Sequence, residues 1–309
     1  MTTLYLCQPA ALHFSTPPGH PERADRIWVI ERTLEQERFA ALTREQAPAA
    51  EIETVALAHS KSYVEGIIKL APREGVVQID ADTTMSPGTI EAALRGAGAA
   101  AKAVDEVMAG RVRNAFSASR PPGHHAERGR ANGFCFFNNV AIAARYAQAK
   151  HGAGRVAVVD WDAHHGNGTQ DIFWSDRSVL FCSTHEMPLY PWTGAASECG
   201  EYGTIVNVPL AADDGGEVFQ QVFEAKILPR IADFNPDLIV ISAGFDAHWR
   251  DPLANLNLTE ADFSWATRRL IDIADRVCDG RIVSLLEGGY DLEGLAKSVA
   301  AHVTALMRN

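Results

Sequence analysis

The sequence has few cysteines, and none of them forms a recognisable motif. They are odd in number and widely scattered, and no two of them form a Cys-x-x-Cys pair. This pattern argues against a disulfide framework and against a thiolate zinc site. We therefore expect a reduced, cytoplasmic protein. The cysteines are Cys7, Cys135, Cys182, Cys199 and Cys278.

Long apolar runs and excess positive charge are also absent. No apolar stretch approaches the roughly 20 residues that a membrane helix needs, and residues 1–7 lack the basic and apolar regions of a signal peptide. The formal net charge is −11, which argues against a nucleic-acid backbone as the main partner. We expect neither membrane nor nucleic acid as a partner, and the sequence does not indicate an oligomeric state.

Short apolar runs alternate with amphipathic or alanine-rich segments along the chain. This alternation predicts a mainly parallel sheet with helices on both faces, an α/β architecture of three layers. No low-complexity linker or internal repeat divides the sequence, so we expect one domain over residues 1–309. The expected strands are Leu4–Cys7, Ala115–Ser119, Val156–Asp162, Val179–Thr184, Thr204–Val208, Leu238–Ala243 and Ile282–Leu286, and the expected helices are Glu22–Arg38, Thr89–Met108, Asn139–Lys150, Glu217–Ile231, Glu260–Arg276 and Leu295–Met307.

The stretch from Val156 to Gly168 is the most informative part of the chain. Four apolar residues, typical of a buried strand, lead into Asp160, Asp162 and His164. Because alternate side chains of an extended segment share a face, we expect these three to point the same way. Carboxylates and an imidazole that converge at a strand end predict a metal site. The alternative, a solvated polar strand end, is disfavoured by the apolar run before it.

A second apolar strand leads into Asp246. In parallel sheets, ligand sites form at the carboxyl ends of the strands, so Asp246 can join Asp162 and His164 there. Three protein ligands leave positions for water and substrate, as in catalytic rather than structural zinc sites. Oxygen-rich ligation also suits other divalent metals, so the identity of the ion stays open.

Three other side chains complete a plausible reaction centre. His124 and His125 are adjacent on a loop stiffened by proline and glycine. One buried histidine usually has a structural role, but two beside unpaired acids favour general acid and base groups. Tyr290 follows a predicted strand on a Gly-Gly turn, where its hydroxyl can donate to a developing oxyanion. By itself this tyrosine would be a packing residue, and only the neighbouring site favours catalysis.

Six motifs in one order make the chain resemble the histone deacetylase superfamily. This arginase-like α/β group also contains bacterial histone deacetylase-like amidohydrolases and acetylpolyamine amidohydrolases. The likeness covers nearly the whole chain. The motifs are His20-Pro-Glu-Arg-Ala-Asp-Arg-Ile, Arg120-Pro-Pro-Gly-His-His-Ala, Gly133-Phe-Cys-Phe-Phe-Asn-Asn, Asp160-Trp-Asp-Ala-His-His-Gly-Asn-Gly, Ser242-Ala-Gly-Phe-Asp and Glu287-Gly-Gly-Tyr.

The resemblance implies the role of each residue in the centre. It implies one catalytic zinc ion on Asp162, His164 and Asp246. His125 would be the general base, His124 an electrostatic partner and proton donor, and Tyr290 would polarise the amide carbonyl. Asp160 would hydrogen-bond His124, and a structural potassium ion would lie near Asp160, Asp162, His164, Ser183 and Thr184.

The resemblance also implies a substrate tunnel. Gly133 and Phe134 would line it, with Tyr190 on the opposite wall. Asp82 matches a rim acid that grips substrate amides. Arg26 matches an inner arginine associated with acetate exit.

Asn167 bears on the subclass. Some relatives carry an aspartate there, paired with the second histidine, whereas class II enzymes carry asparagine. Physically, an amide orients His125 without stabilising its protonated form as a carboxylate would. The chain therefore resembles the class II branch.

The implied reaction is hydrolysis of an N-acyl amide, most simply acetyl-lysine. An alternative is hydrolysis of an acetylpolyamine or another small N-acyl amide. Leu253 falls where one polyamine-selective branch has a glutamate, and an apolar residue there lacks the charge to select an internal ammonium group.

Two rivals are disfavoured. A ureohydrolase with two manganese ions needs an Asp-x-His-x-Asp run, but this chain has Asp162-Ala-His164-His165-Gly, so a second ion lacks ligands. A metal-bound protein that binds acyl amines without turnover usually loses a catalytic group, but His124, His125 and Tyr290 are all present.

Overall fold

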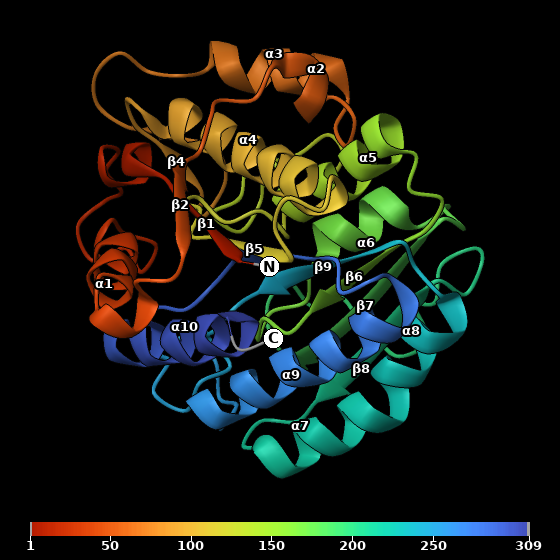
Figure 1. Ribbon diagram of the computed structural model, residues 1–309. Coiled ribbons are helices and arrows are strands. Elements are labelled where there is room, and N and C mark those ends of the chain that lie inside the picture. Colours follow the sequence, from red (N-terminus) through yellow and green to blue (C-terminus); the bar gives the residue numbers. More distant parts are fainter. Residues whose placement is uncertain (1, 308–309) are drawn as a thin grey trace.

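The computed structural model describes residues 2–307. Within them, the centre is an eight-stranded sheet in the order β2-β1-β5-β10-β9-β6-β7-β8, and its paired strands run parallel (Figure 1). A separate antiparallel pair joins β3 to β4. The strands are β1 (Thr3–Cys7), β2 (Thr43–Gln46), β3 (Val77–Gln78), β4 (Thr84–Met85), β5 (Asn114–Ser117), β6 (Val156–Asp160), β7 (Val179–Glu186), β8 (Ile205–Leu210), β9 (Leu238–Ala243) and β10 (Ile282–Leu286).

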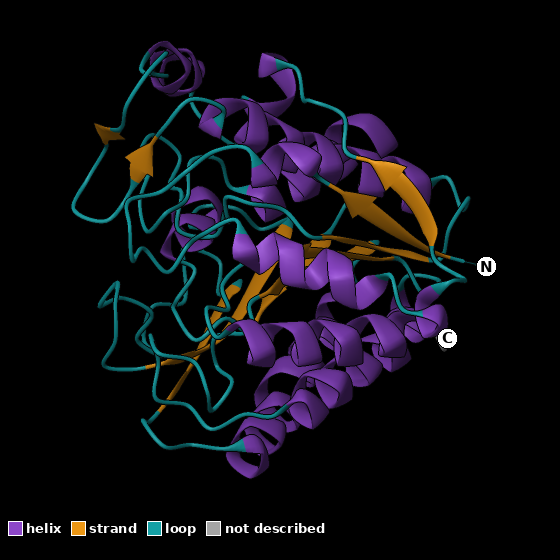
Figure 2. Ribbon diagram, turned by 90° about the vertical axis from the view of Figure 1, so that its left-hand side faces the viewer, coloured by secondary structure: helices purple, strands orange, loops and turns teal. Residues whose placement is uncertain are grey.

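Helices cover both faces of the sheet, as Figures 1 and 2 show. Helices α2 to α6 lie on one face, and α1 with α7 to α10 on the other. This arrangement confirms the expected three-layer, arginase-like α/β fold. Among the described residues, no helix is long and apolar enough to cross a membrane. The helices are α1 (Asp25–Leu34), α2 (Ile52–Val55), α3 (Lys61–Lys69), α4 (Thr89–Met108), α5 (Asn139–His151), α6 (Asn167–Phe173), α7 (Gly216–Val222), α8 (Leu228–Phe234), α9 (Glu260–Val277) and α10 (Leu292–Met307).

The central strands are mostly apolar because both of their faces are buried. In β6, Ala157 and Val159 pack into the core on one side, while Val156 and Val158 pack into the core on the other. Each fully buried valine contributes about 1.5–3 kcal/mol relative to exposure. These cores hold the sheet rigid beneath the loops at its carboxyl edge.

All seven expected strands are present, five of them with shifted ends, but one expectation about β6 is wrong. The strand ends at Asp160 rather than Asp162, and residues 161–166 form bends and loop. Asp162 and His164 therefore do not lie in an extended strand, and strand alternation does not explain how they meet. Edge strand β2 was not expected because its sequence is Thr-Arg-Glu-Gln and its side chains are mostly exposed, as suits an edge.

The expected helix Glu217–Ile231 is longer and irregular. Helices α7 and α8 are joined by a π-helical turn over Phe223–Ile227, and Pro229 is the second residue of α8. Proline has no backbone N–H to donate, so a wider turn that precedes it lets the helix continue. Short helices α2, α3 and α6 were not expected.

A buried histidine in α10, His302, makes the stability of the fold sensitive to acid. His302 is fully buried and bonds to Thr267 Oγ1 at 2.6 Å and Ser284 Oγ at 2.8 Å. Burial lowers the pKa of His302 to about 3, so the folded protein holds it neutral while the unfolded chain protonates it near pH 6.5. Its contribution is complete above pH 6.5 and is lost as pH falls towards 3. Between pH 7.5 and pH 5, this linkage costs about 2 kcal/mol.

Urea unfolding of the native protein and of His302→Gln at these two pH values tests this expectation. The variant should lose about 2 kcal/mol less on acidification, because glutamine does not titrate. His13→Gln, at an exposed position, is the matched control and should keep the native pH dependence. Equal acid sensitivity in native protein and His302→Gln would contradict the linkage.

Candidate functional site

Parallel register brings four loops to one edge of the sheet. Asp160 at the end of β6 is level with Ser242 of β9, and Ala243 of β9 is level with Leu286 of β10. Strand β5 pairs with the other side of β10. The loops that follow β5, β6, β9 and β10 therefore emerge together, and they carry the predicted reaction centre.

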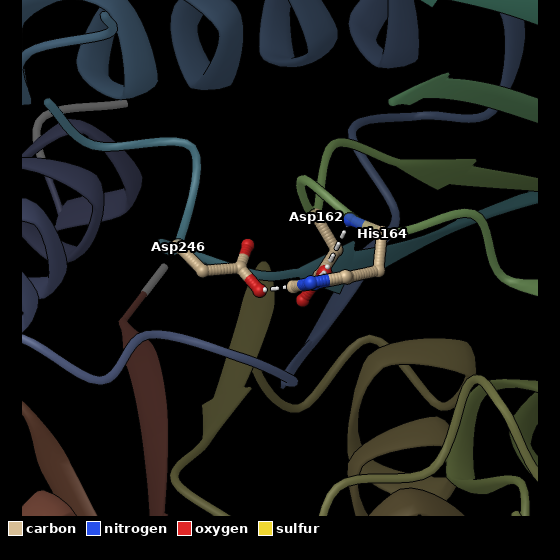
Figure 3. Close-up of side chains that lie close together, drawn as sticks. All are labelled: Asp162, His164 and Asp246. Carbon is tan, nitrogen blue, oxygen red and sulfur yellow. Dashed lines mark hydrogen bonds and ion pairs between the residues drawn. The ribbon is translucent and has the colours of Figure 1, made fainter. Parts of the chain in front are cut away.

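Asp162, His164 and Asp246 converge at this edge (Figure 3). The Nδ1 atom of His164 lies 2.9 Å from Asp246 Oδ2 and 3.2 Å from Asp162 Oδ1. Their candidate ligand atoms all lie within 4.8 Å of one another, and all three residues are buried. Ligands at zinc-bond lengths around a tetrahedral ion are about 3.3 Å apart, so the spacing suits a small metal ion.

Electrostatics in the cluster favour a cation. Burial and the charge of Asp162 raise the pKa of Asp246 to about 7. Burial would also raise the pKa of Asp162, but His124 and His164 lower it well below its ordinary range. Two buried carboxylates that face each other repel unless a positive charge lies between them. The two carboxylates and one imidazole therefore fit a divalent metal ion.

Backbone groups orient both carboxylates. The N–H of Ala163 donates to Asp246 Oδ1 at 2.7 Å, and the N–H of Gly288 donates to Asp162 Oδ2 at 2.8 Å. A Cβ atom at position 288 would overlap the carboxylates of Asp162 and Asp246. Only glycine allows this close approach, which explains one glycine of the Glu-Gly-Gly-Tyr motif.

The two adjacent histidines have different partners. The Nδ1 atom of His124 lies 2.9 Å from Asp160 Oδ2, as expected, and that of His125 lies 2.8 Å from Asn167 Oδ1. Burial would lower the pKa of His124, but Asp162 and Asp160 raise it to about 10. Burial and the nearby positive charge of His124 lower the pKa of His125 well below its usual value. The two environments therefore move the pKa values of the neighbouring histidines in opposite directions, a separation typical of general acid and base pairs.

Tyr290 lies on the opposite loop. Burial raises its pKa well above the ordinary value of 10.0, although the nearby Arg26 opposes this shift. The hydroxyl therefore keeps its proton and can donate a hydrogen bond at neutral pH. The Arg26 guanidinium lies 4.9 Å from the centre of the Tyr290 ring and donates to the carbonyl of Gly289 at 2.6 Å. Arg26 thus packs against the Tyr290 ring and also binds the backbone of the preceding residue.

A pocket of about 260 Å³ adjoins the metal cluster. His125, His164 and Tyr290 line it, together with every residue that the sequence predicts for substrate binding. Gly133 has a φ of +52° and lies so close that a Cβ atom would overlap the His125 ring. Arg26 is not among the lining residues. The remaining lining residues are Asp82, Gly133, Phe134, Leu189, Tyr190 and Leu253.

The predicted potassium residues lie on two neighbouring strands and the following loop. Asp160 of β6 is level with Ser183 of β7, and Thr184 follows it, all three being buried. Asp160 Oδ1 also accepts the N–H of Asp162 at 3.0 Å. Asp160 thus contacts the loop of the metal ligands directly, and the potassium assignment itself stays a prediction.

Two acids that sequence reasoning left without a role organise the centre. Glu287 Oε2 accepts the N–H groups of Gly123 and His124 at 2.6 and 3.0 Å. Asp251 Oδ2 accepts the N–H of Tyr290 at 2.7 Å. Glu287 has the signal that marks Asp160, an acid at the end of an apolar strand, whereas Asp251 lies in a loop and has no such signal.

Comparisons with known proteins agree with this geometry. Residues 20–306 match the histone deacetylase domain. A probable deacetylase of Archaeoglobus fulgidus is 42% identical over 286 residues, covering 90% of this chain and 78% of that protein. A histone deacetylase-like amidohydrolase of Pseudomonas aeruginosa is 40% identical over 278 residues, covering 88% of this chain and 73% of the relative.

A likeness to a solved structure extends over the whole chain. The crystal structure of the HDA15 HD domain has a TM-score of 0.93 and 35% identity, and the match covers 100% of this chain and 90% of that one. The chain therefore belongs to the histone deacetylase family, and the activity that these likenesses support is that of a deacetylase or amidohydrolase.

Proposed function

We propose that this protein is a zinc-dependent amidohydrolase that removes an acyl group, most simply acetyl, from an N-acylated amine such as acetyl-lysine. One observation carries the proposal. The residues that line a single pocket include His164 of the metal triad, the low-pKa His125 and Tyr290. Metal-assisted amide hydrolysis requires a set of metal ligands, a general base and a donor to the oxyanion, and these residues can supply all three. We propose that residues 1–309 form one catalytic domain.

Each residue has a defined task in this proposal. Zinc held by Asp162, His164 and Asp246 would supply Lewis acidity towards the amide carbonyl and an acidified water. His125, neutral and oriented by Asn167, takes a proton from the attacking water. Tyr290 donates its hydroxyl hydrogen bond to the oxygen on which negative charge develops.

The leaving amine needs a proton for the C–N bond to break. His124, held protonated by the Asp160 and Asp162 carboxylates, stabilises the negative charge of the centre and can supply this proton. Asp160, Asp162, His164, Ser183 and Thr184 are proposed to hold a structural potassium ion. Arg26 is proposed to assist the exit of acetate.

The lining of the pocket supports a thin aliphatic substrate chain. Phe134, Leu189, Tyr190 and Leu253 provide apolar walls, and Asp82 provides a carboxylate at the pocket. Leu253 carries no charge with which to select a second ammonium group, so we favour acetyl-lysine over acetylpolyamines.

Release of amine from an acetyl-lysine peptide by zinc-loaded protein, with and without a chelator, tests the proposal. Chelator-sensitive turnover is expected, and acetylpolyamine in the same assay gives the comparison substrate. Retained zinc with no turnover of either substrate would contradict the proposed enzyme and favour a binding protein. Two tightly bound catalytic ions per chain would instead favour the ureohydrolase rival.

Changing the partner of the base should move the pH profile. Asn167→Asp places a carboxylate beside His125 Nδ1, and a negative charge there stabilises the protonated imidazole. The pKa of His125 then rises, and the base is lost to protonation at a higher pH. We expect the pH of half-maximal kcat/KM on the acid limb to increase by about one unit. An unchanged profile would count against this pairing.

A further inference from the structure

The general base of the pocket is the first member of a longer hydrogen-bonded chain. His125 Nδ1 lies 2.8 Å from Asn167 Oδ1, and Asn167 Nδ2 donates to Glu127 Oε1 at 2.9 Å. Asn167 is 9% exposed. Its amide therefore lies between an imidazole and a carboxylate with little room for other partners.

The carboxylate determines which end of the amide faces the imidazole. A carboxylate only accepts hydrogen bonds, so the NH₂ end of Asn167 must face Glu127. The carbonyl end then faces His125 and accepts a hydrogen bond from Nδ1–H. This tautomer leaves Nε2 without a proton, as a general base requires. A reversed amide would donate to Nδ1 and favour the opposite tautomer.

The main chain fixes Glu127 in place. Its N–H donates to the carbonyl of Arg130 at 3.0 Å, and its carbonyl lies 2.9 Å from His59 Nδ1. His59 is buried and also accepts the N–H of Asn138 at 2.8 Å through Nε2. Because Nε2 accepts, Nδ1 carries the proton and donates to Glu127. The side chain of Glu127 thus extends from an immobilised backbone.

We propose that Glu127 is a positioning residue that sets the amide orientation of Asn167 and, through it, the tautomer of His125. Glu127 is not among the residues that line the pocket beside the metal cluster, and in this proposal it acts only through Asn167. This inference rests on the proposed deacylase function, in which His125 is the base. It adds a residue from a second pocket, of about 530 Å³, which Glu127 and Asn167 both line.

Three variants separate the positioning role of Glu127 from the effects of side-chain size and of charge in the pocket. Glu127→Met keeps the length but removes the acceptor, and we expect kcat to fall about tenfold with KM unchanged. Glu127→Gln keeps the length and an acceptor oxygen but adds an NH₂ donor, so it permits both orientations of the Asn167 amide, and its kcat should fall between those of native protein and Glu127→Met. Asp171→Asn removes a charge from the same pocket, where the Asp171 carboxylate accepts the N–H of Arg128 rather than a hydrogen bond from the Asn167 side chain, and it serves as the control.

A double variant tests whether Glu127 acts on His125 through Asn167. In an Asn167→Ala background, Glu127→Met should cause no further loss, because Glu127 has no amide left to orient. An undiminished loss in that background would show a different route and overturn the proposal.

Tautomer measurement separates this inference from the proposed function. ¹⁵N NMR of the zinc-loaded protein should show His125 protonated on Nδ1 in native protein, with an Nε2–H population in Glu127→Met and a smaller one in Glu127→Gln. Persistence of Nδ1–H alone in Glu127→Met would overturn the proposal. If native protein shows no turnover but Glu127→Met shows the expected change of His125 tautomer, the deacylase function is refuted and the positioning role of Glu127 is still supported.

Discussion

Replacement of Tyr290 by phenylalanine should lower kcat about 10²–10³-fold while KM changes by less than about threefold. The ring remains to pack between Phe134 and Arg26, so the pocket keeps its shape. What is lost is a hydroxyl whose raised pKa keeps it protonated, and hence a donor to the oxygen on which charge develops. Steady-state kinetics on an acetyl-lysine peptide measure both constants.

Tyr146→Phe is the matched control for this change. Its hydroxyl bonds to Asp105 Oδ2 at 3.2 Å between α4 and α5, away from the residues that line the catalytic pocket. We expect native kcat and KM from it. Tyr290→Phe with near-native kcat would remove Tyr290 from the mechanism, while an equal loss in both variants would point to general destabilisation.

Replacement of Asp246 by asparagine should abolish turnover through loss of the metal. The amide can still accept the N–H of Ala163, so the loop keeps its anchor. The negative ligand is gone, however, and a neutral amide oxygen is a weaker ligand for zinc than a carboxylate. We expect bound zinc to fall from about one ion per chain to below about one tenth after dialysis, measured by elemental analysis.

The other end of the same strand provides the control. Asp237 directly precedes β9, where its Oδ2 accepts the N–H groups of Gly154 and Arg155 at 2.7 and 2.9 Å. Asp237→Asn should retain zinc and activity. Native zinc content in Asp246→Asn would exclude this residue as a required ligand, and zinc loss in both variants would make the effect one of folding.

Much of the fold was predictable because its central strands are apolar on both faces. Residues such as Val156–Val159 and Leu238–Ile241 enter the two cores alternately, and strands buried in this way leave continuous apolar runs in the sequence. Edge strand β2 left no such run because water covers much of it. Its pairing with β1 depends on backbone hydrogen bonds, which the sequence does not record.

The convergence of Asp162, His164 and Asp246 was also predictable, but the reason offered for it was partly wrong. Asp162 and His164 do not alternate along a strand, since β6 ends at Asp160. The turn of residues 161–166 and the close approach of Gly288 bring them to Asp246. Glu127 and Asp251, which hold other members of the centre, lie in loops and carry no periodic signal.

The sequence by itself determined the α/β architecture, the candidate metal triad and the pair of adjacent histidines, because burial patterns and ligand chemistry are properties of residue type and spacing. Only the tertiary structure decided which partner each group meets. It places a carboxylate beside His124 and an amide beside His125, and it places Glu127 behind that amide. Hydrogen-bond partners and pKa shifts depend on distances of a few ångströms between residues far apart in the chain, and those distances exist only in the folded protein.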